Sequence, residues 1–288
     1  MTTPRRNRVD LHCHSARSDG VLEPRTLLDA MRRWGLHVAS VTDHDTLAGY
    51  RELRAAGLTS GTPRLLAGVE INCLAPDMTG RPDGELHVLG IGVDPDDAEF
   101  EAVLAGQRAA RQERAAEMVE RLRAIGMPID DALPEALGSG VVAPGRPHIA
   151  RVLVAAGFAE SVDDAMRRIL SPGAPAYVPR RGIGPRDAIE AIRRAGGVAS
   201  LAHFREAPER RYLIARLMAW GLGALEVYYA SFDEPTVSRM ARFAAGLGLL
   251  ATGGSDYHGD TWTYAQAQAA THVPDEVAGR LLAALALD

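Results

Sequence analysis

A short apolar run followed by two histidines and an aspartate opens the chain, where residues 9–20 read VDLHCHSARSDG. His12 and His14 are two residues apart, and because side chains alternate along a β-strand, both imidazoles point to the same face. Asp19 follows in the loop, next to a glycine that is typical of a turn. This arrangement suits a metal ion, and it places the chemistry at the end of a strand.

Strands and helices alternate along most of the chain. The segments with strand character are residues 8–13, 37–42, 64–73, 86–93, 198–203, 224–229 and 249–254. Helical patterns occupy residues 24–34, 46–56, 207–220, 234–246 and 274–287. Alternation of this kind predicts an α/β fold with a mostly parallel sheet. Seven strands approach the number that closes a barrel, so we expect a distorted (β/α)7 TIM-like barrel.

The alternation stops between residues 97 and 180, where the pattern is helical and rich in arginine. A crossover between neighbouring strands does not need so many residues. We therefore predict two domains: a barrel formed by residues 1–97 and 180–288, and a helical insertion of residues 98–179 that caps the substrate site. Glutamates interleave the arginines of residues 108–123, a pattern typical of a solvated helix face.

The composition argues against several classes of protein. The 288 residues carry a net charge of −5, which argues against a surface that coats duplex DNA. The sequence contains neither a run of about 18 apolar residues nor a signal-peptide core, so we expect no membrane partner and a cytoplasmic location. Cys13 and Cys73 both fall in predicted strands, without the paired spacing of a disulfide framework.

Histidines and carboxylates stand at or just after the successive predicted strands. The nine candidate metal ligands are His12, His14, Asp19, His44, Glu70, His87, His203, Asp256 and His258. In a parallel barrel the carboxyl ends of all strands meet at one rim, so these groups are expected to share one pocket. Buried together without cations, they would repel each other and lack partners.

The number and type of these ligands indicate the metal and the substrate. Imidazole and carboxylate groups suit Zn, Mn and Fe. Nine ligands exceed what one ion needs, and three divalent ions with a bridging carboxylate account for them. The ions outweigh the three carboxylates in charge, so the pocket attracts a dianion, and a phosphate group is the natural part of the substrate to bind there.

Taken together, the motifs resemble those of the PHP (polymerase and histidinol phosphatase) family of metal-dependent phosphoesterases. They are DLHCHS at residues 10–15, SDG at 18–20, VTDHDTLAG at 41–49, GVEI at 68–71, the segment around His87, SLAH at 200–203 and GSDYHG at 254–259. The resemblance spans nearly the whole chain. Phe204 departs from the proline that the family often has at this position, but it lies outside the ligand set.

The resemblance implies a distorted seven-stranded barrel with a centre of two or three ions, Mn being favoured. The implied ligand sets are His12, His14, Glu70 and Asp256 for one metal, Asp19, His44 and His258 for a second, and Glu70, His87 and His203 for a third. A hydroxide held between the first and third sets would attack the phosphorus atom in line, because metal binding lowers the pKa of water towards about 7.

The insertion, with GRPH at residues 145–148, resembles that of a stand-alone branch of the family. Members of this branch hydrolyse nucleoside 3',5'-bisphosphates and trim RNA from a 5'-monophosphate end. We therefore expect a phosphoric ester hydrolase that releases the 3'-phosphate of such nucleotides to leave the 5'-monophosphate, or that degrades short 5'-phosphorylated RNA. A histidinol-phosphate phosphatase and a non-catalytic PHP module for binding or regulation are the alternatives.

Residues outside the ligand set are expected to bind substrate or to support the ligands. Arg146 would clamp a second phosphate with two parallel hydrogen bonds. His148 either assists Arg146 or packs against the insertion. Tyr228 and Tyr229 are candidates for stacking a base, Tyr228 being the choice, and one of the two is expected in the core because neighbours on a strand face opposite ways. Asp43 and Asp45 either orient neighbouring ligands or cap the next helix. Exposure on the surface is the favoured interpretation of Arg180, Arg181 and Arg205.

Overall fold

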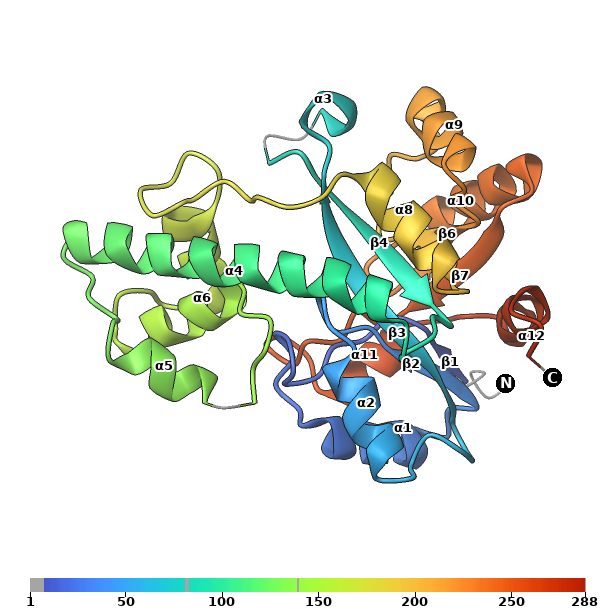
Figure 1. Ribbon diagram of the computed structural model, residues 1–288, viewed down its shortest axis with the longest axis horizontal. Coiled ribbons are helices and arrows are strands. Elements are labelled where there is room, and N and C mark those ends of the chain that lie inside the picture. The colour runs from blue at the N-terminus through green and yellow to red at the C-terminus, as the bar shows by residue number, and fades with distance from the viewer. Residues whose placement is uncertain (1–7, 81–82, 139, 288) are drawn as a thin grey trace.

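The computed structural model describes residues 8–80, 83–138 and 140–287 (Figure 1). Residues 1–7 and 288, with which the predicted barrel domain begins and ends, lie outside the described residues, as does residue 139 in the predicted insertion. Among the described helices, none combines length with enough apolar character to cross a membrane. Cys13 and Cys73 are buried free cysteines.

Seven strands form one sheet in the order in which they follow each other along the chain. The strands are β1 (Val9–Asp10), β2 (Val38–Val41), β3 (Arg64–Leu74), β4 (Glu85–Ile91), β5 (Val198–Leu201), β6 (Ala224–Tyr229) and β7 (Leu250–Gly254). The two edges meet where the amide of Leu11 donates to the carbonyl of Gly253 at 3.1 Å and where Cys13 and Tyr257 form a parallel bridge. The sheet is therefore nearly closed, and the predicted fold class is confirmed.

Strand β4 runs antiparallel to both of its neighbours, an exception to the predicted parallel sheet. The other strand pairs of the sheet are parallel. Residues 75–84 join β3 to β4, and their described part contains the short helix α3 (Pro76–Thr79). A connection of this length is too short for the crossover that a parallel pair requires. As a result, the amino end of β4 reaches the rim where the parallel strands end, and His87 lies opposite Asn72 of β3.

Helices cover the outside of the barrel (Figure 1). They are α1 (Pro24–Trp34), α2 (Ala48–Ala55), α8 (Pro185–Arg194), α9 (Arg211–Ala219), α10 (Glu234–Leu247), α11 (Tyr264–Ala270) and α12 (Asp275–Ala284). Helix α1 has the predicted bounds because Pro24 fits its first turn and Gly35 takes the left-handed conformation that ends it. Helices α8 and α11 were not predicted. The apolar face of α8 packs on the sheet, where Ile189 and Ile192 share a buried core with Ile71.

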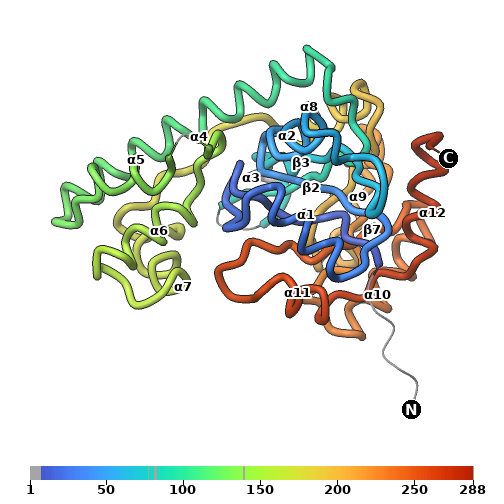
Figure 2. The backbone as a smooth tube through the Cα atoms, turned by 90° about the horizontal axis from the view of Figure 1, so that it is seen from below, coloured from blue at the N-terminus to red at the C-terminus, as the bar shows by residue number. Residues whose placement is uncertain are grey.

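The helical segment between β4 and α8 lies to one side of the barrel (Figure 1, Figure 2). Its helices are α4 (Ala98–Ala124), α5 (Ala132–Leu137), α6 (Arg146–Ala155), α7 (Val162–Ala165) and a π-helical turn at Met166–Leu170. Helix α4 begins in the barrel core with Phe100 and Leu104 and ends in a second apolar core with Met118 and Leu122. Because one long helix contributes to both cores, it holds the other insertion helices beside the rim.

Candidate metal centre

The nine ligands predicted from the sequence lie together at the rim of the barrel. They form three groups, and in each group one nitrogen or oxygen atom of every member lies within 4.8 Å of those of the others. The groups are His12, His14, Glu70 and Asp256; His14, Asp19, His44 and His258; and Glu70, His87 and His203. The first and third groups have the membership that the resemblance implied, and the second gains His14.

Glu70 lies at the centre of the cluster. Its Oε1 atom is 2.8 Å from Nδ1 of His87 and 3.1 Å from Nε2 of His203. Its Oε2 atom is 3.3 Å from Nε2 of His14 and 3.0 Å from Nδ1 of His44. One buried carboxylate thus reaches imidazoles of all three groups, as a bridging ligand must.

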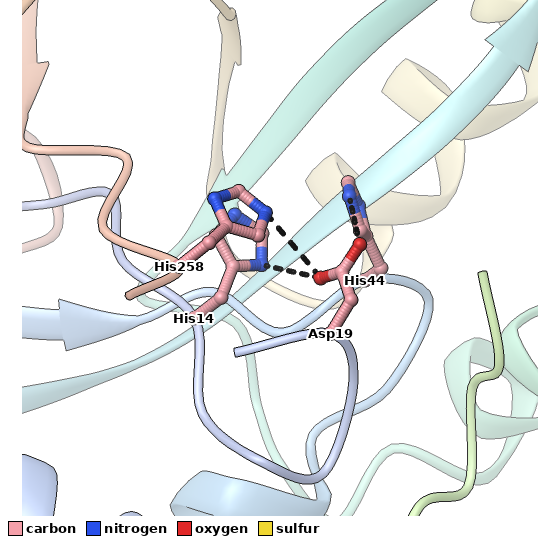
Figure 3. Close-up of side chains that lie close together, drawn as sticks. All are labelled: His14, Asp19, His44 and His258. Carbon is pink, nitrogen blue, oxygen red and sulfur yellow. Dashed lines mark ion pairs between the residues drawn. The ribbon is translucent and has the colours of Figure 1, made fainter. Parts of the chain in front are cut away.

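In the second group, Asp19 faces three imidazoles, as Figure 3 shows. Its Oδ1 atom lies 3.4 Å from Nε2 of His258 and 3.7 Å from Nδ1 of His14, and its Oδ2 atom lies 3.5 Å from Nε2 of His44. The other nitrogen of His14, Nε2, lies 3.2 Å from Oδ1 of Asp256 in the first group. His14 therefore offers one nitrogen to each of two groups.

Several buried ligand atoms have no hydrogen-bond partner within the part of the chain that the structure describes. They are Nε2 of His12, Nδ1 and Nε2 of His14, Nδ1 of His44, Oδ1 of Asp19 and Oδ1 of Asp256. Leaving a buried polar atom without a partner costs about 1–3 kcal/mol, and more for a charged group. Imidazole nitrogens and carboxylate oxygens are also donors that divalent metals accept. The residues therefore fit the cations that the sequence predicts.

The crowding of acids and imidazoles shifts the ionisation of the cluster. Burial favours a neutral imidazole and lowers the pKa of His44 to about 4. Burial acts in the same direction on His258, but the charges of Asp19 and Asp256 outweigh it and raise the pKa of His258 to about 10. Burial would raise the pKa of Asp256, yet neighbouring imidazoles, His12 first among them, hold this pKa well below its usual range. The buried carboxylates thus demand positive charge close by, which divalent ions also supply.

Asp43 fixes the loop that carries Asp19. Its carboxylate accepts hydrogen bonds from the amide and the hydroxyl of Ser15 at 2.8 and 2.7 Å, and from the hydroxyl of Ser18 at 2.8 Å. These three bonds hold the turn between His14 and Asp19. Asp43 therefore supports the loop between two candidate ligands, whereas the sequence left open whether it orients neighbouring ligands or caps the next helix.

Two further supporting carboxylates, Glu226 and Asp10, were missed from the sequence. Glu226 is fully buried, with Oε1 2.9 Å from Nδ1 of His12, and its Oε2 accepts a hydrogen bond from the amide of His203 at 2.7 Å. Asp10 accepts hydrogen bonds from the amide and the hydroxyl of Ser255 at 2.9 and 2.7 Å. The signal was a carboxylate inside an apolar strand, as in the run ALEVYY, because a buried charge requires partners.

The backbone is strained at three residues that follow strands at the rim. Asp45, His203 and Asp256 have φ angles of 52°, 31° and 48°. Residues other than glycine rarely adopt positive φ, and such strain persists only where the surroundings enforce it. Hydrogen bonds hold the backbone in this strained conformation. The amide of His203 donates to Glu226, and Ser255, which precedes Asp256, donates to Asp10.

Asp45 connects the barrel to the insertion. Its carboxylate accepts hydrogen bonds from Nε of Arg111 at 2.5 Å and from the amide of Asn72 at 3.2 Å. The interpretation of Asp45 as the cap of α2 was wrong, because this helix begins at Ala48, whose amide bonds to the hydroxyl of Thr46 at 3.1 Å. Arg111 belongs to α4, so the pair ties the insertion to the loop after β2.

A cavity of about 180 Å³ lies between the ligand cluster and the insertion. On the insertion side it is lined by Arg111, Arg146 and Arg180, and by Glu85 at the start of β4. Glu85 lies 3.5 Å from Nε of Arg180, 3.6 Å from Nη2 of Arg146 and 3.7 Å from Nη2 of Arg114. We call these four arginines the arginine cluster. Its guanidinium groups outnumber the nearby carboxylates, so this side of the cavity favours an anion.

The prediction of solvated arginines was wrong for three members of this cluster. The side chains of Arg111, Arg114 and Arg180 are at most 7% exposed. Among the described residues, Nη2 of Arg114 and Nε of Arg180 have no hydrogen-bond partner. The reason is that one face of α4 packs on the rim of the barrel, whereas Arg181 points outward and pairs with Glu117.

Arg146 lines the cavity, and His148 does not. Arg146 is the first residue of α6, which aims its side chain back over the rim towards Glu85. His148 is buried in the first turn of the same helix, where its Nδ1 accepts a hydrogen bond from the amide of Gly145 at 3.1 Å. The packing interpretation of His148 therefore describes its place in the structure.

The tyrosine that reaches the ligand cluster is Tyr229. Its hydroxyl donates to Oδ2 of Asp256 at 2.9 Å, and its ring lies 5.5 Å from that of His203. Tyr228 packs against the apolar cores of the barrel instead. The choice of Tyr228 was wrong because successive side chains of a strand point in opposite directions, and the register of β6 against β7 shifts between Glu226 and Tyr228.

Known proteins are similar to this chain in both sequence and fold. Residues 10–120 match the family model of the PHP domain. A 5'-3' exoribonuclease of Haemophilus influenzae is 34% identical over 259 residues, which cover 87% of this chain and 90% of the relative. A 3',5'-nucleoside bisphosphate phosphatase of Chromobacterium violaceum is 34% identical over 256 residues, or 87% of each chain. A crystal structure from Bifidobacterium adolescentis, assigned to the metal-dependent phosphoesterases, covers 98% of both chains with a TM-score of 0.83 at 33% identity.

Proposed function

Because the chain belongs to the PHP-domain family of metal-dependent phosphoesterases, we propose that it removes the 3'-phosphate from nucleoside 3',5'-bisphosphates. The observation that supports this substrate is the presence of two anion sites on one cavity, the candidate metal centre and the arginine cluster. A nucleotide with two phosphates fills both sites at once. RNA with a 5'-monophosphate fills them in the same way, with its first phosphodiester in place of the 3'-phosphate.

The three ligand groups support a centre of three divalent ions, for which we favour Mn. Glu70 would bridge the groups, and His14 would join the first to the second. When bound, such ions stabilise charge on the phosphoryl oxygens and make water acidic enough to act as a nucleophile near neutral pH. The chain contributes the ligands and their orientation. Glu226 hydrogen-bonds Nδ1 of His12, so that Nε2 of this ring faces the centre.

The arginine cluster would hold the second phosphate, the one that is not cleaved. A guanidinium group can grip a phosphate with two parallel hydrogen bonds. Burial strengthens such contacts, because little water competes for them. Residues 98–179 supply Arg111, Arg114 and Arg146, so we propose that this insertion is the domain that selects the substrate.

The alternatives fit the site less well. Histidinol phosphate carries an ammonium group, which the arginine cluster would repel. A non-catalytic module would not need all nine ligands, several of them buried with atoms that lack a partner. Adenosine 3',5'-bisphosphate, adenosine 3'-monophosphate and histidinol phosphate, each offered with Mn, separate these functions by the rate of phosphate release. Faster hydrolysis of histidinol phosphate would overturn the proposal.

The role of Arg146 can be tested separately. We expect Arg146→Ala to raise the KM for adenosine 3',5'-bisphosphate at least tenfold, because a hydrogen bond to a charged group contributes about 1.5–3 kcal/mol. Hydrolysis of adenosine 3'-monophosphate should change little. Arg181→Ala is the matched control, since Arg181 is 57% exposed and pairs with Glu117. If Arg146→Ala weakened the hydrolysis of both nucleotides equally, Arg146 would not be the residue that binds the second phosphate.

A further inference from the structure

An aromatic groove lies beside the candidate metal centre, between α1 and residues 257–266. Its volume is about 640 Å³. Tyr257 and Tyr264 are buried at its base, with their rings edge to face at 5.2 Å. Trp34 and Trp262 also line it, and Trp262 is 38% exposed. Two of the three tryptophans of the chain therefore line this one groove.

A ridge formed by residues 19–22 and 258–259 lies between this groove and the cavity at the candidate metal centre. Asp19 and His258 line the cavity, whereas Leu22 and Gly259, a few residues further along the same two segments, line the groove. The two segments are joined where the amide of Val21 donates to the carbonyl of His258 at 2.8 Å. From this ridge the groove runs along α1 to Trp34, and this helix is 11 residues or about 16 Å long. An RNA strand extending from the cavity across this ridge would enter the groove.

The side chains of the groove suit a single-stranded nucleic acid. Aromatic rings bind successive bases by stacking, whatever the base. Arg33 supplies a cation for a phosphate, and the hydroxyls of Thr26 and Thr261 are hydrogen-bonding groups. Asp260 is the one carboxylate among the described residues that line the groove, and it is already paired with Arg151 at 2.7 and 2.6 Å. The groove thus offers stacking surfaces without an unpaired acid to repel phosphates.

We propose that this groove binds the nucleotides that follow the cleaved linkage in 5'-phosphorylated single-stranded RNA. The first nucleotide would occupy the cavity, and the next bases would cross the ridge and stack on Trp262 and Trp34. This inference rests on the proposed function, because it extends the substrate of the same centre from a nucleotide to an oligonucleotide. It makes RNA length a determinant of affinity, whereas a nucleoside bisphosphate does not reach the groove.

The test compares adenosine 3',5'-bisphosphate with 5'-phosphorylated oligoadenylates of two, four and six nucleotides, each with Mn. For the unchanged protein, we expect the KM to fall as the RNA grows longer. Trp262→Ala should raise the KM of the hexanucleotide about fivefold or more and remove most of the length dependence. Hydrolysis of the bisphosphate by this variant should stay unchanged, which also shows that the variant is folded.

Tyr212→Ala is the matched control, because Tyr212 is an aromatic residue, 79% exposed, that lines a different hollow. It should alter neither substrate. If Trp262→Ala and Trp34→Ala both retain the length dependence while the bisphosphate is hydrolysed, the groove proposal is wrong and the proposed function stands. If the bisphosphate is not hydrolysed at all, the proposed function fails, and quenching of tryptophan fluorescence by the hexanucleotide still decides whether RNA occupies the groove.

Discussion

Oε1 of Glu226 lies 2.9 Å from Nδ1 of His12, and both side chains are fully buried. The other oxygen of Glu226 accepts a hydrogen bond from the amide of His203 at 2.7 Å. One carboxylate on β6 therefore fixes the ring of one candidate ligand and the backbone of another. Because Nδ1 of His12 is engaged, Nε2 is left to face Asp256 and Glu70 at 3.2 and 3.5 Å. A carboxylate that contacts the ring nitrogen facing away from the metal centre thus sets the orientation of the other ring nitrogen towards it.

We expect Glu226→Gln to weaken the affinity for Mn about 10- to 100-fold, because it removes a carboxylate that orients a ligand imidazole. Isothermal titration calorimetry, in which Mn is added to the metal-free protein, measures this affinity. Glu276→Gln, on the exposed side of α12, is the matched control and should bind Mn as the unchanged protein does. Equal affinities of the two variants would show that Glu226 only fills space.

Gly49 of α2 leaves room for the contact between Asp43 and Ser15. A Cβ atom at this position would overlap Oδ2 of Asp43 and lie 2.8 Å from Oγ of Ser15. We expect Gly49→Ala to lower phosphate release at least tenfold, since a ligand displaced by about 1 Å can cost about 100-fold in rate. The rate at saturating Mn is the measurement, and an unchanged rate would mean that the loop carrying Asp19 adapts.

Gly106 of α4 provides the matched control for that substitution. A Cβ atom there meets no neighbouring atom within 4 Å among the described residues. Alanine loses less backbone freedom on folding than glycine does, so Gly106→Ala should raise the free energy of unfolding by about 0.5–1 kcal/mol. Urea denaturation checks this value. A fall in stability would mean that α4 needs the glycine for a reason that the packing does not reveal.

The buried pair of Arg111 and Asp45 holds the insertion to the barrel. We expect Arg111→Ala to lower the free energy of unfolding by about 3–5 kcal/mol, because it leaves a buried carboxylate without its partner. Urea denaturation is again the measurement. Arg111→Met combined with Asp45→Asn should recover part of the loss, since neither charge then remains. Arg123→Ala removes an exposed pair between the same helix and Asp130 in the turn that follows it, and should cost less than about 1 kcal/mol.

Removal of the metal should abolish phosphate release and lower the thermal midpoint. The reason is that ions which bind only the folded chain stabilise it, by about 2.7 kcal/mol at 100 times the dissociation constant. An assay of phosphate release follows the first effect and scanning calorimetry the second, each before chelation, after chelation and again after Mn is restored. Glu70→Gln should respond to Mn far less, because Glu70 contacts imidazoles of all three groups. Full activity in excess chelator would contradict a metal-dependent mechanism.

The nine candidate ligands could be found in the sequence because their signals are local. His12 and His14 are two apart on a strand, as are Asp256 and His258 beyond the last strand, and each follows a short apolar run. Helix α1 could be bounded for the same reason, since a proline and a glycine mark its two ends. Position relative to a strand end depends on near neighbours, so it can be read without knowing what the segment later packs against.

Other features depend on contacts between distant segments. The direction of β4 follows from a short connection and from pairing with two strands far apart in sequence. Arg111 and Arg180 were assigned to the surface, yet both line the cavity, Arg111 because α4 lies across the rim. A helix that is polar on several sides gives no local sign of which side will be buried.

The sequence by itself thus indicated which side chains are candidate metal ligands and that they lie in or just after the strands of an α/β barrel. Only the tertiary structure decided which carboxylates, such as Glu226, hydrogen-bond to the ligands and hold them in place. It also decided which arginines face the substrate cavity. The physical reason is that a metal ligand is recognised by its type and its place on a strand. The role of a buried charge, by contrast, is set by the partner that the fold brings to it from elsewhere in the chain.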